Sequence, residues 1–276
     1  MLTVSQLFIY PVKSLGGIAV DAAVVTDRGF QYDRRWMLID EHNSFISQRE
    51  MAAMALFDVA IQEDGLLVTH KPGGDAIHIP FEPQTNETLT VEVWSDRCKA
   101  IVVSHQANQW FSNKLGINCR LVYMPGAVKR RVDGRYAIDK EIVSFADGYP
   151  MLLIGQASLD DLNSRLDEQL TMRRFRPNIV FTGGEPFEED VMEAFKINTI
   201  LFYGVKLCAR CVITTINPDT AVKGKEPLRT LATYRMKNNK IYFGQNLLHK
   251  GEGLIQVGDA MEVIKRKEAI RNFKQA

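Results

Sequence analysis

The sequence has few cysteines and no long apolar run. Four cysteines in 276 residues are too few for a disulfide scaffold, and they favour a reducing, cytoplasmic environment. No stretch approaches the roughly 18 apolar residues of a membrane span. The first ten residues have neither the basic start nor the cleavage site of a secretory signal. The 34 basic and 33 acidic residues nearly cancel, so a general attraction to nucleic acid or acidic membranes is excluded, and any basic site must be local.

The composition is that of a folded, globular chain. Hydrophobic residues make up 46% and charged residues 24%, which argues against intrinsic disorder. At roughly 150 residues per domain, the length predicts about two domains. No low-complexity linker separates two halves, so we expect the domains to share an interface.

Short apolar segments between turn signals predict many strands, typical of a barrel or sandwich. Helical spacing of apolar residues predicts a helix at 106–116, with Gly116 as its C-cap. A second helix is expected at 158–170 with Ser158 as N-cap, and a weaker one at 187–195. The fold class is therefore α+β, strand-rich with few helices. Strands are expected to return at 178–182, 199–207, 241–245 and 261–264.

The pair Cys208-Ala-Arg-Cys211 is the sharpest local feature. It is compatible with zinc, with thiol exchange, with one cysteine binding another soft metal, or with two small buried side chains. Zinc is disfavoured because Cys98 and Cys119 form no second pair and the histidines lack metal-site spacing. A thioredoxin-like dithiol is disfavoured because the residues that follow are β-rich, not helical. Arg210 beside Cys211 would favour the thiolate, which is the metal-binding form.

An arginine-rich segment is the second feature. Arg173, Arg174 and Arg176 stand close together ahead of Asn178, whose amide can donate and accept hydrogen bonds. Guanidinium groups bind phosphate in a bidentate manner, so the segment is either an anion clamp or a charged surface loop.

The loop at 10–17 is the third feature. Its Lys13-Ser14 pair can bind phosphate or carboxylate through ammonium, hydroxyl and backbone N–H groups, although the P-loop pattern is absent. Of Arg34 and Arg35, we expect one to face a site and the other to face solvent.

Two further charged segments are less specific. Asp147 precedes an apolar strand, where it is either a site carboxylate or a turn former. The cluster Lys129–Arg131 with Arg135 lacks stacking aromatics beyond one tyrosine, which favours a solvated face over a nucleic-acid patch.

These segments occur together in one order. Tyr-Pro-Val-Lys-Ser stands at 10–14, Asp-Arg-x-Trp at 33–36, Phe-Arg-Pro-Asn-Ile-Val at 175–180, and Cys-x-Arg-Cys at 208–211 precedes Pro-Asp-Thr and Lys-Glu-Pro-Leu. The set resembles the molybdenum cofactor sulfurase C-terminal (MOSC) domain family, and within it the mitochondrial amidoxime-reducing components and their bacterial relatives. The resemblance covers about residues 2 to 264. It implies an N-terminal β-barrel-like domain over 1–120 packed with a β-barrel MOSC domain over 121–276.

The resemblance also implies a molybdenum–molybdopterin cofactor and the residues that bind it. Cys211 would be the metal ligand, whereas Cys208 matches a position that is not a ligand. Asp147 matches a carboxylate near the metal and, with Cys211, would be catalytic. Where the relatives usually have Ser, Asp and Gly, this sequence has Ala209, Asn217 and Ala221. The implied cofactor-binding residues are Lys13, Ser14, Arg34, Arg176, Asn178, Arg210 and Cys211.

The activity implied by the resemblance is that of a cytoplasmic molybdenum oxidoreductase with a detoxification role. It would reduce small N-oxygenated compounds (amidoximes, hydroxylamines, N-hydroxylated bases) by oxygen-atom abstraction at molybdenum. The sequence has no plant-type iron–sulfur pattern, so a separate iron–sulfur or haem protein with its reductase is expected to supply electrons. Neither nucleic acid nor a membrane is an expected partner. The alternative is a non-catalytic module that binds or carries the molybdenum cofactor or sulfur.

Overall fold

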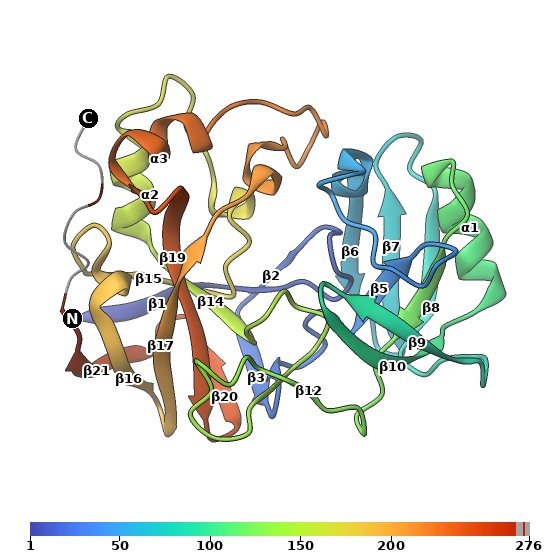
Figure 1. The fold of residues 1–276 in the computed structure, drawn as a ribbon, viewed down its shortest axis with the longest axis horizontal. Helices are drawn as coiled ribbons and strands as arrows, with labels where there is room; N and C mark the ends of the chain where they lie inside the picture. The colour runs from blue at the N-terminus through green and yellow to red at the C-terminus, as the bar shows by residue number, and fades with distance from the viewer. Residues whose placement is uncertain (269–272, 274–276) are drawn as a thin grey trace.

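The computed structural model describes residues 1–268 and 273. Within them it has three α-helices, a closed seven-stranded barrel and several smaller curled sheets, which confirms the strand-rich class with few helices. Figure 1 shows the barrel strands gathered in one half of the molecule and the sheets that carry β5 to β10 in the other.

The barrel runs in the order β14–β15–β1–β21–β16–β17–β19, and a β14–β19 pairing closes it. Only the β14–β15 pair is parallel among these strands. The first strand of the chain, β1, pairs with β15 and β21 from the far end of the sequence. The barrel strands are β1 (Leu2–Ile9), β14 (Met151–Gly155), β15 (Ile179–Thr182), β16 (Met192–Ile197), β17 (Ile200–Ala209), β19 (Lys240–Lys250) and β21 (Ala260–Arg266).

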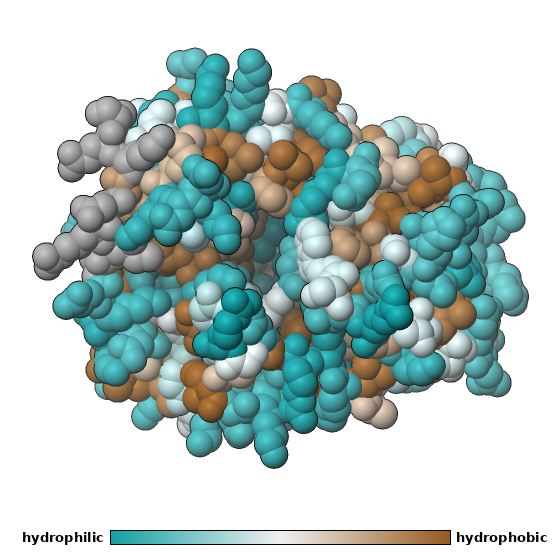
Figure 2. All heavy atoms as spheres, in the orientation of Figure 1, coloured by the Kyte–Doolittle hydropathy of each residue, from teal (hydrophilic) through white to brown (hydrophobic). Residues whose placement is uncertain are grey.

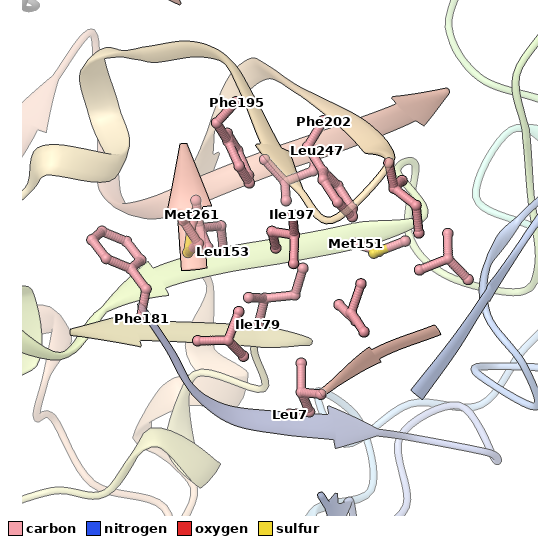
Figure 3. Close-up of a cluster of buried hydrophobic side chains, with 14 of the residues drawn as sticks. Leu7, Met151, Leu153, Ile179, Phe181, Phe195, Ile197, Phe202, Leu247 and Met261 are labelled. Atoms are coloured by element: carbon pink, nitrogen blue, oxygen red, sulfur yellow. The ribbon is translucent and has the colours of Figure 1, made fainter. Parts of the chain in front are cut away.

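Side chains fill the inside of the barrel. Alternate residues of its strands point inward because successive side chains of a strand face opposite sides. Figure 3 shows Leu7, Leu153 and Ile179 in this cluster. The rings of Phe195 and Phe202 are stacked, with their centres 5.3 Å apart. The barrel is therefore a packed core, not a channel, and a binding site must lie outside it.

The other half is built from two antiparallel sheets and α1. The sheets β5–β11–β10–β9 and β6–β7–β8 share an apolar core that includes Trp36, Phe57 and Phe111. Helix α1 begins after Ser104, whose side chain accepts from an amide of the first turn, and ends at Gly116 with φ of 69°. The elements are β5 (Trp36–Ile39), β6 (Phe57–Ile61), β7 (Gly65–His70), β8 (Ala76–Pro80), β9 (Thr88–Val93), β10 (Asp96–Val102), α1 (His105–Leu115), β11 (Arg120–Tyr123) and the 3-10 helix η1 (Ala52–Leu56).

Strand pairing crosses the expected domain division. Both β1 and β3 lie within residues 1–120, yet they pair with β15 and β20 of the second half. The boundary at residue 120 stays a prediction. The remaining elements are β2 (Ile18–Val20), β3 (Ala22–Thr26), β4 (Gly29–Phe30), β12 (Arg130–Arg131), β13 (Ile142–Val143), α2 (Gln156–Asn163), η2 (Met172–Arg174), η3 (Glu188–Val191), η4 (Val212–Thr215), α3 (Leu228–Tyr234), β18 (Met236–Lys237) and β20 (Gly253–Gln256).

The helix predictions were correct in part. The helix expected at 106–116 is α1, but the one expected at 187–195 is wrong, because η3 occupies its start and β16 its end. The second helix, α2, is shorter than expected and its N-cap is Gly155. Ser158 is instead buried within α2, and its hydroxyl donates to Glu189 Oε2 over 2.8 Å. Helix α3 was not predicted.

Candidate functional site

A cavity of about 600 Å³ lies between the two halves and takes its walls from both. Figure 2 shows a recess between the halves on the face drawn there. All of the site residues predicted from the sequence line this cavity, although they come from positions far apart in the chain. They are Lys13, Ser14, Arg34, Asp147, Arg176, Asn178, Arg210 and Cys211.

The two cysteines of the C-x-x-C pair lie on one wall. Cys208 is the second-last residue of β17, and Cys211 directly precedes η4 in an extended conformation. Both thiols are free. Adjacency in the sequence had suggested that Arg210 acts on Cys211. In the structure, Arg210 Nη1 donates instead to Cys208 Sγ over 3.0 Å. The backbone carbonyl of Cys211 accepts from Thr214, which fixes the residue at the cavity wall.

Protein ligands for a metal are sparse here. Within residues 1–268 and 273, no three His, Cys, Asp or Glu side chains are grouped closely enough to hold a metal ion. A metal bound through Cys211 would therefore need most of its donors from a second, non-protein group. A dithiolene, which supplies two sulfur atoms, fits this donor set.

Lys13 and Asp147 form an ion pair across the cavity. Lys13 is 5% exposed, and its Nζ lies 2.5 Å from Asp147 Oδ1 and 2.8 Å from the carbonyl of Phe145. Burial lowers the pKa of Lys13, and the carboxylate of Asp147 only partly offsets this. Partial loss of solvation opposes ionisation of Asp147, whose side chain is 58% exposed, but the cations of Lys13 and Arg49 outweigh it and hold the pKa of that carboxyl well below its usual range. Asp147 is thus a fixed anion.

Two arginines of the cavity pack on one buried tyrosine. The guanidinium carbons of Arg34 and Arg176 lie 4.4 and 4.3 Å from the centre of the Tyr10 ring. Burial, together with repulsion from Arg34, lowers the pKa of Arg176 to about 10. Arg34 is paired with buried Asp33 at 2.5 Å, whereas the guanidinium of Arg176 donates to the carbonyl of Leu15 and has no carboxylate partner among the described residues. The geometry holds both cations beside each other despite their repulsion.

Asn178 positions its neighbours. Its Oδ1 accepts from Arg34 Nη1 over 3.0 Å, and its Nδ2 donates to Asp33 Oδ1 and to the carbonyl of Phe8. The backbone N–H of Leu152 also reaches Oδ1 over 3.3 Å. Both amide donors and both acceptor lone pairs are thus engaged by the protein. The side chain is better placed to orient Arg34 than to bind a ligand itself.

The cavity is strongly basic although the chain is nearly neutral. Nine lysine and arginine side chains line it against three aspartates. Five of these cations form no ion pair with a described residue of the chain. Since unpaired cations this close together repel one another, the arrangement favours binding of an anionic group. The five are Arg131, Arg174, Arg176, Lys206 and Arg210.

Sequence reasoning missed three residues of the site. Arg130 was grouped with a solvated basic face, but it is 5% exposed and donates to the carbonyls of Ser144, Ala146 and Asp147. It therefore holds the loop that presents Asp147. Arg49 and Trp94, from the other half, both donate to the Asp147 carboxylate, over 3.3 and 3.2 Å. No local motif marks these residues, because only the fold brings them to the cavity.

Strained backbone gathers at the same place. Eleven described non-glycine residues have positive φ, and four of them line the cavity. Residues outside glycine, asparagine and aspartate rarely adopt this region, and such conformations cluster at functional sites. The four are Ser14 (67°), Arg34 (49°), Trp94 (58°) and Arg176 (55°).

Comparison with known proteins agrees with the fold and the cavity. Residues 1–118 match the MOSC N-terminal beta barrel domain and residues 140–262 match the MOSC domain, so the chain is a protein of the MOSC class. Within that class, it belongs to the family that includes the mitochondrial amidoxime-reducing components.

Three relatives illustrate the family. Mitochondrial amidoxime-reducing component 1 of Mus musculus is 32% identical over 95% of this chain and 82% of its own length. Component 2 of Bos taurus is 33% identical over 93% and 82%. Component 2 of Homo sapiens is 34% identical over 85% and 72%. Among the described residues of the present chain, no helix has the length and apolar character needed to cross a membrane.

Proposed function

We propose that this protein is a molybdenum-cofactor-dependent reductase of N-oxygenated compounds, with amidoximes, hydroxylamines and N-hydroxylated bases as substrates. The observation that carries the proposal is a thiol, Cys211, in a cavity with five cations that form no ion pair with a described residue. A pyranopterin with a terminal phosphate would neutralise these cations and supply the missing sulfur donors. The names of the relatives support the same substrate class.

Residues of both halves would hold this cofactor. Cys211 is the proposed metal ligand. Lys13, Ser14, Arg176 and Arg210 would bind the charged and polar groups of the pterin, because these residues line the cavity. Asn178 would act through Arg34, which it orients. When bound, molybdopterin supplies two-electron redox chemistry at molybdenum, and the protein supplies orientation and charge.

Asp147 and Lys13 have different proposed roles. Asp147 remains ionised at neutral pH, so it would accept a hydrogen bond from the N–H group of a substrate and orient it. Lys13 has a lowered pKa and donates to Asp147, which makes it the nearest proton source to that carboxylate. Reduction of an N–OH group releases water and needs two protons, so such a source is required.

Electrons would come from a separate iron–sulfur or haem protein served by a reductase. A cytoplasmic location remains a prediction from cysteine usage, whereas the names of the relatives place those proteins in mitochondria.

Metal content and turnover test the proposal together. The protein is purified from a host that makes the cofactor, and metals are measured by plasma mass spectrometry. We expect about one molybdenum per chain in the wild type and in Cys208→Ser, and none in Cys211→Ser. Reduction of benzamidoxime to benzamidine with a strong chemical reductant is then measured. Molybdenum without turnover would favour the carrier alternative, and zinc lost equally in both variants would overturn the molybdenum assignment.

A further inference from the structure

Trp94 lies at a backbone position that rarely takes a tryptophan. The β9–β10 hairpin pairs Val93 with Asp96, so Trp94 is the first residue of a two-residue turn, with φ of 58°. Only Trp94, not Ser95, has positive φ in this turn, and a hairpin turn of that kind favours glycine at its first central position. A bulky aromatic residue here is strained, which points to a function that the turn itself does not explain.

The ring of Trp94 is held by its neighbours and is only partly covered by them. The guanidinium carbon of Arg49 lies 4.5 Å from the ring centre, and the ring of Phe45 lies 4.9 Å away. Indole Nε1 donates to Asp147 Oδ1 over 3.2 Å. Despite these contacts the residue is 48% exposed, and it lines the cavity. An oriented, half-exposed indole is an apolar surface held ready for a flat ligand.

We propose that Trp94 is a specificity-determining residue that stacks on planar substrates. This inference rests on the proposed function and names the favoured substrates, which are aromatic amidoximes and N-hydroxylated bases. A ring stacked on the indole lies beside Asp147, because Trp94 Nε1 contacts that carboxylate. The N–H groups of the substrate can then donate to Asp147. Hydroxylamine has no ring, so it cannot stack on the indole of Trp94.

Two variants separate stacking from a structural role of the indole N–H. Trp94→Ala removes both the ring and the hydrogen bond to Asp147. Trp94→Phe keeps an aromatic face and removes only the hydrogen bond. If Trp94 acts by stacking, the two variants differ in their preference between substrates, whereas if it only holds Asp147 they behave alike.

The first measurement is the ratio of kcat/KM for benzamidoxime to that for hydroxylamine, with a chemical reductant. We expect Trp94→Ala to lower this ratio about tenfold, equivalent to about 1.4 kcal/mol, through KM for benzamidoxime. Trp94→Phe should keep the ratio within about threefold of the wild type, in the range of an aromatic contact of similar geometry. An unchanged ratio in Trp94→Ala, or an equal loss in both variants, would overturn the proposal that Trp94 stacks on the substrate.

The second measurement needs no turnover. Benzamidoxime is titrated into oxidised, cofactor-loaded protein without an electron donor, and tryptophan emission is followed. We expect the ligand to quench emission in the wild type and in the control Trp110→Phe, whose residue lies in α1 away from the cavity. Loss of the response in Trp94→Phe assigns it to Trp94. Quenching that persists there would place the ligand elsewhere. If the wild type binds but reduces neither substrate, the proposed function fails and the binding site stands.

Discussion

Two regions of the molecule arrange charge in opposite ways. In the cavity between the halves, cations outnumber carboxylates, and five of them, half-buried or exposed, lack an ion pair among the described residues. Beside the barrel, by contrast, Asp190 and Arg235 form a buried pair at 2.5 Å, and Ser158 donates to buried Glu189. A buried charge that is paired inside the chain stabilises the fold. Cations left in excess around a cavity favour an anionic ligand.

The largest expected effect comes from breaking the satisfied pair. Arg235→Ala leaves Asp190 buried without its cation, so the free energy of unfolding should fall by about 3 to 5 kcal/mol in chemical denaturation. The matched control is Arg229→Ala, which breaks an exposed pair with Glu226 and should cost less than about 1 kcal/mol. Equal losses in the two variants would show that the buried pair stabilises the fold no more than an exposed one.

A pH dependence of stability sharpens the same contrast. Burial, aided by the neighbouring Asp190, raises the pKa of Glu189 to about 8. Because the folded-state pKa lies above the unfolded value, this group stabilises the fold fully below pH about 4.5. That contribution is lost as the pH rises through about 8.

Glutamine does not ionise, so in Glu189→Gln the loss of stability with rising pH disappears. Between pH 5 and 8, the free energy of unfolding of the wild type should therefore fall, relative to the variant, by on the order of 3 kcal/mol. Denaturation series at matched ionic strength measure the difference. Parallel curves for the two proteins would show that Glu189 ionises in the fold as readily as in the unfolded chain.

The smallest effect concerns a cation of the cavity. The Lys206 ammonium lies 4.4 and 5.7 Å from the centres of the Tyr136 and Tyr149 rings and forms no ion pair with a described residue, so Lys206→Ala should change stability by less than about 0.5 kcal/mol. Cofactor-free wild type should melt about 2 to 4 °C higher in about 10 mM phosphate than in chloride of equal ionic strength. The variant should show a smaller shift. Identical melting in the two salts would contradict an anion site.

The sequence predicted the members of the site better than their contacts. The motifs that contain Lys13, Arg176 and Cys211 could be recognised in order along the chain, and the structure brings them to one cavity. The contact of Arg210 with Cys208 could not be predicted, because adjacency in sequence does not determine where a guanidinium points. Trp94 belongs to a hairpin of the other half, and only the packing of the two halves places it near Asp147.

The fold shows a similar limit. Helix α1 carries its own capping residues, so local signals were sufficient to predict it. The segment at 187–195 was misjudged because its apolar residues fit helical spacing, whereas pairing of β16 with β17 and β21 decides its conformation. Pairing between distant strands depends on the whole chain and leaves little local trace.

The closed barrel has a consequence for the order of assembly. Strand β1 leaves the ribosome about 250 residues before its neighbour β21, so the barrel can close only after β21 has been made. At roughly 5 to 20 residues per second, Leu2 and Thr3 of β1 wait on the order of 10 to 50 seconds for their partners in β21. The sheets of β5 to β11 are complete by residue 123 and can fold meanwhile. A chaperone that shields β1 should therefore raise the yield of folded protein more than one that binds β21.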